Sequence, residues 1–281
     1  MFNENLSITK TKSNRLKQAR RGIKRKLKIR LKKWHNYPEP RFATQGSFTT
    51  GTMIRNERDW CDLDMGIYFF QDLDLTYGSI QKHIKEALFD HTNGEVKLLS
   101  KCIRVVYSND FHIDMPIYLV KEQGVFLLGS KSNNWTRCDS KKFKDWVKKE
   151  AADNDQLIRI IRYFKAWADR YRTSKSIKMP SGLVFTIWTV QHYESNIRDD
   201  ISFIKTATHI LKELKSSWIC EMPVETKDNV LEKLNDDQQD NFKEALKELI
   251  KKGYEALTQD DKAKSLKIWK SMLGRRFTDI I

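Results

Sequence analysis

The sequence lacks the features of a secreted, membrane-spanning or disulfide-stapled protein. No apolar run in its 281 residues approaches the roughly 18 residues that a transmembrane helix needs, and the polar first residues do not resemble a secretory signal peptide. The cysteines (Cys61, Cys102, Cys138 and Cys220) are widely spaced and form no C-x-x-C pair. Neither a disulfide framework nor a cysteine-rich zinc site is therefore expected, and we predict a cytoplasmic protein without membrane contact.

Glycine and proline are also scarce, with 11 and 5 residues respectively, which excludes collagen-like and low-complexity chains. Aromatic residues are plentiful, since the chain has 14 Phe, 9 Tyr and 8 Trp. This supply of core-forming side chains argues against disorder, and a chain of this length buries roughly three-quarters of the surface that it exposes when unfolded. We therefore expect one large domain or two lobes, folded without cross-links.

Acidic residues are absent from one long segment near the N-terminus. From Lys10 to Lys33 there are 13 basic residues and no Asp or Glu, whereas the rest of the chain holds 39 basic against 37 acidic residues. The basic face is either the solvated side of a docked helix or a contact surface for a polyanion such as nucleic acid or nucleotide phosphates. The apolar residues recur three or four positions apart, which predicts an amphipathic helix; they are Leu16, Ala19, Ile23, Leu27, Leu31 and Trp34.

The remaining pattern predicts an α+β fold. Residues 61–70, 95–107 and 111–119 alternate like strands, with a short helix expected at 79–90. Because Pro116 cannot donate a hydrogen bond, the last of these strands is expected to lie at a sheet edge or to be near its end there. From about residue 140 the pattern becomes helical, and the candidate helices are 141–152, 155–172, 181–195, 199–216, 237–256 and 259–273.

This pattern divides the chain into three parts. We predict a basic amphipathic helix at 1–36 that packs on the core, a small mixed sheet with its helices at 37–138, and a helical lobe at 139–281. Whether the first helix spans both of the other parts is left open. Asp236 is expected to cap the fifth helix of the lobe, and Gly274 is expected to end the last one.

Residues 45–52 are rich in glycine and hydroxyl groups. Gln45-Gly46-Ser47 is followed by Phe48-Thr49-Thr50-Gly51-Thr52, shortly before the first strand. Glycines beside hydroxyls in that place expose backbone N–H groups to a phosphate, although Gly-Ser is also common in ordinary turns. Alone, this segment is only a weak sign of a phosphate site.

Acidic residues on two predicted strands give a stronger sign. Asp62 and Asp64 are two positions apart and therefore point to the same side of their strand. Such like charges repel unless a cation lies between them, and Mg²⁺ with its oxygen ligands fits; a pair of solvated surface acids is the alternative. Asp114 alternates with large apolar residues in the same way. If the two strands are neighbours, three carboxylates meet and form a two-metal site that activates a hydroxyl and holds a triphosphate.

Together these motifs resemble a known family. Gly46-Ser47, Asp62-x-Asp64 and a later Asp114 resemble the signature of polymerase β-like nucleotidyltransferases, and the fuller form from Gln45 to Tyr68 resembles the bacterial cGAS/DncV-like nucleotidyltransferases (CD-NTases). The resemblance extends over roughly residues 10–281. It includes Arg162-Tyr163-Phe164-Lys165-Ala166-Trp167, Pro180-Ser181-Gly182-Leu183 and the segment from Trp269 through Gly274 to Phe277.

The resemblance implies a polymerase β-like nucleotidyltransferase core and a metal site. Asp62 and Asp64 would bind two Mg²⁺ ions, with Mn²⁺ as a substitute. Asp114 would join one metal and help to deprotonate the attacking ribose hydroxyl. These three residues are the expected catalytic and metal-binding set.

The resemblance also implies a nucleotide site. Gly46 and Ser47, with Gln45 beside them, would hold the donor triphosphate, and Lys165 and Ser181 would hold its far end from the helical lobe. From the residues alone, Lys165 interrupts an apolar helical face, so that its amine either reaches water or meets an anion. Ser181 could equally be a helix cap.

Two further acids and two neighbours of the motif are interpreted as bystanders. The second acidic pair, Asp72-Leu73-Asp74, follows the strand and is expected to lie in a solvated loop. Cys61 and His112 are expected to be neighbours of the metal site rather than ligands, and His112 is expected to face solvent.

The implied function is template-independent synthesis of a cyclic di- or trinucleotide second messenger from NTPs, with ATP among the substrates and pyrophosphate released. The product would act on a separate effector protein in bacterial anti-phage signalling. One alternative is a nucleotidyltransferase with an RNA or protein acceptor. Another is a nucleic-acid sensor that uses the basic N-terminal helix.

Overall fold

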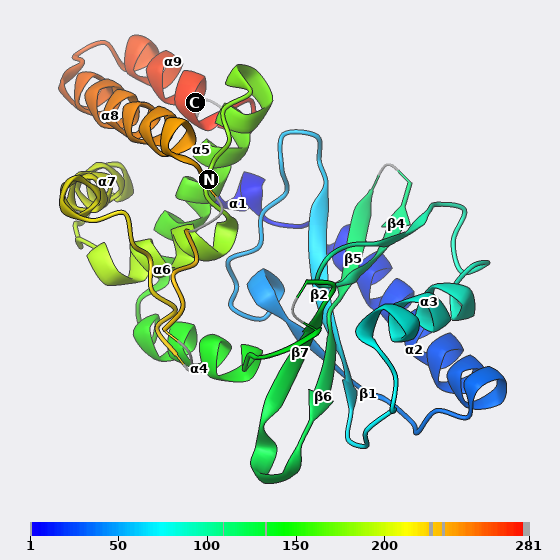
Figure 1. Ribbon diagram of the computed structural model, residues 1–281. Helices are drawn as coiled ribbons and strands as arrows, with labels where there is room; N and C mark the ends of the chain where they lie inside the picture. Colours follow the sequence, from blue (N-terminus) through cyan, green and yellow to red (C-terminus); the bar gives the residue numbers. More distant parts are fainter. Residues whose placement is uncertain (1, 109, 133, 225–226, 232–233, 278–281) are drawn as a thin grey trace.

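The computed structural model describes residues 2–108, 110–132, 134–224, 227–231 and 234–277. Figure 1 shows a sheet with two helices on one side and a separate group of helices on the other. Among the described residues, one cluster of buried apolar side chains lies under the sheet and another lies within the helical lobe. None of the described helices has the length and apolarity that crossing a membrane requires.

The sheet is built around β2 (Cys61–Phe69), which pairs in parallel with β5 (Phe111–Met115) and β6 (Ile117–Val120). The strand order is β3-β4-β5-β2-β6-β7-β8, and β1 pairs with β2 outside this path. This mixed sheet agrees with the predicted α+β class. The remaining strands are β1 (Arg41–Gln45), β3 (Val96–Leu98), β4 (Ile103–Tyr107), β7 (Phe126–Ser130) and β8 (Asn134–Arg137).

Two of the predicted strands are broken. The segment 95–107 is a hairpin of β3 and β4 rather than one strand. Pro116 separates β5 from β6, so that β5 ends directly before it as expected, but β5 is not an edge strand because it lies between β4 and β2. The proline carbonyl still accepts a hydrogen bond from the backbone N–H of Ile67 (2.9 Å).

The amphipathic helix α2 (Lys10–His35) covers the apolar face of the sheet together with α3 (Tyr77–Ala87) (Figure 1). Its apolar stripe is buried, with Leu16, Ile23, Leu27 and Leu31 at most 1% exposed. Trp34, which was expected on this stripe, is instead 40% exposed. The centroid of its ring lies 4.9 Å from the Arg30 guanidinium. This cation–π contact covers part of the ring, which stays outside the core.

A short first helix, α1 (Phe2–Leu6), packs against the helical lobe. Leu6 is fully buried in the core of that lobe, and Arg162 of the lobe donates hydrogen bonds to Asn3 and Ser7. The N-terminal segment therefore contacts both parts, α1 on the helices and α2 on the sheet. The boundaries at 36/37 and 138/139 stay a prediction.

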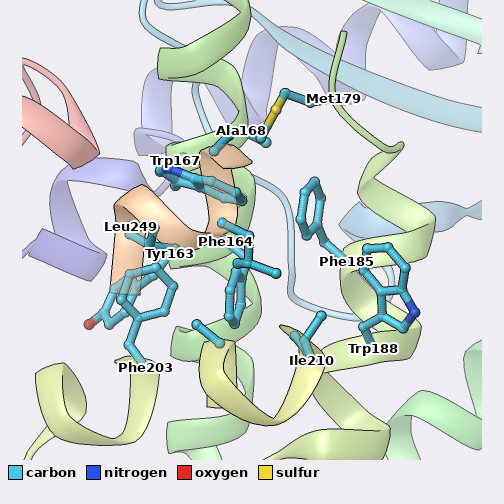
Figure 2. Packing of buried hydrophobic residues seen from close by; sticks show 14 of the residues in the cluster. Tyr163, Phe164, Trp167, Ala168, Met179, Phe185, Trp188, Phe203, Ile210 and Leu249 are labelled. Carbon is cyan, nitrogen blue, oxygen red and sulfur yellow. The ribbon is translucent and has the colours of Figure 1, made fainter. Parts of the chain in front are cut away.

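The helical lobe packs around aromatic side chains of its long helices. Figure 2 shows Phe164 and Trp167 of α5 against Phe185 of α6 and Phe203 of α7, and the Phe164 and Phe203 rings are 4.6 Å apart. The helices of the lobe are α4 (Ser140–Glu150), α5 (Asp155–Lys175), α6 (Gly182–His192), α7 (Asp199–Ser216), α8 (Asp236–Thr258) and α9 (Lys262–Leu273).

Of the two helix ends predicted from the sequence, one agrees with the structure and the other is wrong. Gly274 ends α9 with a positive φ of 87°, as expected. The N-cap of α8 is Asn235 rather than Asp236, because the Asn235 side chain and Gln238 form a reciprocal capping box. Elements that the sequence analysis did not predict are α1, β1, β7 and β8, all of which are short and depend on pairing or packing with distant residues.

Candidate active site

A cavity of about 400 Å³ lies between the sheet and the helical lobe. Its walls come from the loop before β2, from β2 and β5, and from α5 and α6. Of the residues predicted as a site, six line this cavity: Gly46, Ser47, Asp62, Asp64, Asp114 and Lys165. Gln45 and Ser181 do not line it.

The strand pattern places the acids on one face. Leu63 and Met65 are buried beneath the sheet, so that the alternating Asp62 and Asp64 point to the opposite side. In the parallel pairing of β2 and β5, Asp64 is the register partner of Asp114. The two strands are therefore adjacent in the sheet, as predicted, and all three carboxylates line one cavity.

Two of the three carboxylates are held by basic neighbours. The guanidinium of Arg104 donates two hydrogen bonds to Asp114, from Nε to Oδ1 and from Nη2 to Oδ2, both 2.7 Å long. The Nδ1 of His112 lies 2.9 Å from Asp62 Oδ1. The His112 ring is also covered by Trp60, with 4.6 Å between ring centroids. His112 is therefore beside the acids, as expected, but is tied to Asp62 rather than facing solvent.

Asp64 has a different environment. The pKa of its carboxyl group is raised to about 7, mainly by burial and also by the negative charges of Asp114 and Asp62. Cys61, three residues earlier, is buried on the other side of β2, where burial raises the pKa of the thiol to about 11. The Asp64 position thus concentrates negative charge that no adjacent side chain neutralises fully.

The donor set suits a hard divalent cation, since it consists of carboxylates without a thiol. Among the described residues, no three Asp, Glu, His or Cys side chains converge as a complete ligand group. This agrees with the contacts above, because Arg104 engages both oxygens of Asp114. The positive guanidinium of Arg104 therefore takes the place at the Asp114 carboxylate that a cation would need. The three carboxylates therefore fit a cation, provided that at least one hydrogen bond between Arg104 and Asp114 breaks when the cation binds.

Gly46 begins the loop that lines the cavity in front of β2. It begins a short 3₁₀ helix, η1 (Gly46–Phe48), with a φ of 66°, and its carbonyl accepts hydrogen bonds from the backbone N–H groups of Thr49 and Thr50. A Cβ atom at this position would lie 2.1 Å from Asp64 Oδ2. Only glycine lets the loop approach the carboxylate this closely.

The side chain of Gln45 points away from the cavity. Its Nε2 donates to the Tyr118 hydroxyl (3.0 Å), and its Oε1 accepts from the hydroxyls of Tyr68 (2.9 Å) and Ser140 (3.0 Å). Gln45, Tyr68 and Ser140 line a second cavity of about 340 Å³. Gln45 directly precedes the loop, but its side chain supports the loop from behind instead of lining the cavity between the sheet and the helical lobe.

Lys165 enters the cavity from α5. Its Nζ donates to Thr52 Oγ1 (2.8 Å) and to the Thr52 carbonyl (3.3 Å). The pKa of its amine is lowered to about 7, mainly by burial and also by the nearby Arg162, while the charge of Asp64 opposes the shift. The lysine thus reaches the cavity rather than bulk water. Ser181 instead caps α6 by accepting from the Val184 backbone N–H, and its neighbour Gly182 lines the cavity.

Sequence reasoning missed two contacts of this site. Arg104 alternates with the buried Ile103 and Val105, and this pattern could have placed it on the acidic face. Thr52 gave no signal of its role as the partner of Lys165. The second acidic pair lies where it was predicted, since Asp72 and Asp74 are exposed in a loop and Asp72 pairs with Lys121 (2.5 Å).

Part of the sequence matches a known protein family and a named relative. Residues 40–118 match the family model described as the nucleotidyltransferase domain of cyclic GMP-AMP synthase DncV-like proteins. A protein of Escherichia albertii named cyclic GMP-AMP synthase is 32% identical over 199 residues, which cover 66% of this chain. The match spans 44% of the length of that relative.

Solved structures share the fold along almost the whole chain. Vibrio cholerae DncV bound to 3′-deoxy GTP has a TM-score of 0.84 at 19% identity, with 98% of this chain and 93% of that chain covered. Escherichia coli DncV bound to 3′-deoxy GTP has a TM-score of 0.81 at 17% identity, with 98% and 94% covered. These likenesses confirm the predicted fold: a mixed sheet, a helical lobe and a long N-terminal helix.

Proposed function

Because the chain belongs to the DncV-like nucleotidyltransferase family, we propose that it condenses NTPs into a cyclic di- or trinucleotide and releases pyrophosphate. One observation carries the proposal. The acids of β2 and β5 line one wall of a cavity whose other wall holds Lys165. Carboxylates beside an acceptor hydroxyl and a cation beside a phosphate chain are the two halves of a phosphoryl-transfer site.

Relatives indicate which nucleotides to test. The Escherichia albertii relative is named a cyclic GMP-AMP synthase. Vibrio cholerae DncV has been crystallised with nonhydrolyzable GTP and with the linear intermediate 5′ pppA(3′,5′)pG. We therefore propose ATP and GTP as the first substrates to examine in this chain.

The proposed reaction assigns a role to each side of the cavity. Asp114 accepts the proton of the acceptor ribose hydroxyl at a carboxylate oxygen, and the hydroxyl oxygen then attacks the α-phosphorus of the donor. The bond between the α-phosphorus and the bridging oxygen breaks, and pyrophosphate leaves. Gly46 and Ser47 hold the donor triphosphate, and Lys165 balances the charge on the departing phosphates. A second transfer within the linear intermediate closes the ring.

We also propose that the site works with two Mg²⁺ ions, for which Mn²⁺ is a substitute. Asp62 and Asp64 would bind them, with Asp114 joining one. When bound, such ions neutralise the phosphate charge and polarise the reacting oxygens. The raised pKa of Asp64 supports this assignment, because a carboxyl group crowded by like charges gains from a cation.

The place of the reaction in the cell follows from the same proposal. The cyclic product would act as a second messenger on a separate effector protein in anti-phage signalling. Synthesis from NTPs would take place in the cytoplasm, where these substrates are abundant.

The proposal is tested with purified protein, the four NTPs and Mg²⁺, with Mn²⁺ in parallel. After phosphatase treatment we expect a resistant oligonucleotide, which mass spectrometry identifies by its bases. An Asp62→Asn/Asp64→Asn variant serves as the control and should form none. Products that phosphatase degrades completely, or nucleotides attached to added RNA or protein, would contradict cyclisation and favour a different acceptor.

A second candidate function, binding of nucleic acid, is supported by the surface of α2. Lys26 and Arg30 of this helix pair with Asp90, and Lys28 pairs with Glu39. Further basic residues are exposed, and no ion pair joins them to another described residue; they are Lys10, Lys17, Arg21, Arg25 and Lys33. Unpaired charges along one helix favour a phosphate backbone as the partner.

Reversing this charge is expected to weaken RNA binding. In a Lys17→Glu/Arg21→Glu/Arg25→Glu variant, fluorescence anisotropy with a labelled single-stranded RNA should give a dissociation constant at least about tenfold higher, and a smaller dependence of affinity on salt. The matched control changes the same charge on exposed lysines of α8 and α9.

That control is Lys251→Glu/Lys262→Glu/Lys267→Glu, and none of the three lysines pairs with an acid among the described residues. It should bind RNA like the wild type. Equal losses in both variants would indicate a response to net charge alone, and no loss in either would exclude α2 as the contact surface.

A further inference from the structure

The contact between Arg104 and Asp114 joins neighbouring strands directly. The two residues are opposite each other in the antiparallel pairing of β4 and β5. Both guanidinium bonds measure 2.7 Å, which is the two-pronged geometry in which arginine binds a carboxylate most firmly. Ile103 and Val105, on either side of Arg104, are fully buried. The backbone that carries this guanidinium is therefore anchored in the core.

This contact competes with a cation for the same atoms. The guanidinium engages both Asp114 oxygens, so that a metal ion joining Asp114 must displace at least one of the two hydrogen bonds. Asp64 differs, because no hydrogen bond or ion pair joins its carboxylate to another described side chain. Of these two facing acids, only Asp114 has a resident positive partner.

We infer that Arg104 is a positioning residue that holds Asp114 in a fixed orientation and opposes the binding of a divalent cation until nucleotide is present. The inference rests on the proposed function, since Asp114 meets a cation only in that reaction. Free cation gains too few ligands to displace the guanidinium. A cation that arrives with the phosphates of a nucleotide brings further oxygen ligands with it. One of the two hydrogen bonds from Arg104 then breaks, and the Asp114 oxygen that it held binds the cation.

Removing the guanidinium should therefore have two opposite effects. Cation binding to the nucleotide-free protein should become tighter, because a competing positive charge is lost. Turnover should become slower, because Asp114 loses the contact that orients it toward the acceptor hydroxyl. A purely structural role predicts no gain in cation affinity.

The experiment measures Mn²⁺ binding alone, in chelator-treated protein without nucleotide, from the electron paramagnetic resonance signal of free Mn²⁺. We expect Arg104→Gln to bind Mn²⁺ about tenfold more tightly than the wild type, and the gain should vanish in Arg104→Gln/Asp114→Asn. With NTPs, kcat should fall about tenfold or more. Unchanged or weaker Mn²⁺ affinity in a folded Arg104→Gln protein would overturn the inference.

Two further variants keep the test decisive. Arg104→Lys retains the positive charge but cannot form two parallel hydrogen bonds to Asp114, and it replaces Arg104→Gln if that protein does not fold. It should show a smaller gain in Mn²⁺ affinity than expected for Arg104→Gln. No gain in Arg104→Lys would then overturn the inference. Arg159 forms a similar fork with Asp199 in the helical lobe (2.6 and 2.9 Å). Arg159→Gln is the matched control and should leave Mn²⁺ affinity unchanged; an equal gain there would also overturn the inference.

Failure of the proposed function would look different. If wild-type protein makes a cyclic product but Arg104→Gln does not tighten Mn²⁺ binding, only the inference fails. If no product forms but Mn²⁺ binding tightens in a way that needs Asp114, the competition stands and the proposed reaction fails. If the wild type binds no Mn²⁺ even with nucleotide, both fail.

Discussion

Asp64→Asn is expected to reduce product formation by at least about a thousandfold. The proposed site loses one of the carboxylates that hold the cation, and several kcal/mol of lost charge stabilisation correspond to about three powers of ten in rate. The measurement is the rate of pyrophosphate release under saturating NTPs. Asp72→Asn is the control, because Asp72 is exposed and pairs with Lys121 away from the cavity.

The same substitution is expected to stabilise the metal-free fold above neutral pH. Asp64 has a pKa of about 7 in the folded protein against a reference value of 3.8. The folded state therefore binds more protons between these values, so that the free energy of unfolding falls as pH rises through this window. Above pH 7 the full penalty is present, and asparagine removes it.

We expect a gain of roughly 2 kcal/mol at about pH 8, which is about half of the full pKa shift because Asp64 remains partly accessible to water. Near pH 4 the gain should disappear, since aspartic acid is then protonated in the folded state. Urea unfolding in the presence of a chelator gives both values. Full activity of Asp64→Asn would refute its role in the reaction, and a gain that does not change with pH would refute the electrostatic cause.

Gly46→Ala is expected to lower activity by about a hundredfold. The new Cβ would lie 2.1 Å from Asp64 Oδ2, so that either the loop or the carboxylate must move, and a displacement of about 1 Å at a reacting group costs roughly that factor in rate. Alanine is also strained at a φ of 66°. Together these effects should lower the free energy of unfolding by about 1–2 kcal/mol.

Gly124→Ala separates the two causes. Gly124 also has a positive φ, 75°, but a Cβ there meets no atom within 4 Å. The control should therefore lose about 1 kcal/mol of stability from backbone strain and keep full activity. If Gly46→Ala retained activity like the control, the close approach of the loop to Asp64 would have no part in catalysis.

The face of the sheet that carries the acids was determined by the sequence alone. Alternation along 61–70 and 111–119 put Asp62, Asp64 and Asp114 opposite the apolar residues, because side chains of a strand alternate in direction whatever surrounds it. The buried stripe of α2 followed from helical spacing for the same reason. These features are local, since each depends on residues only a few positions apart.

Only the tertiary structure decided which partner each polar side chain meets. Gln45 turns toward Tyr118 and away from the cavity, and Lys165 meets Thr52 across a separation of 113 residues. No periodicity encodes such contacts, because hydrogen bonds between distant segments depend on how strands pair and lobes pack. The fork between Arg104 and Asp114 is of this kind: the alternation of β4 orients the guanidinium, but only the antiparallel register with β5 brings it to the carboxylate.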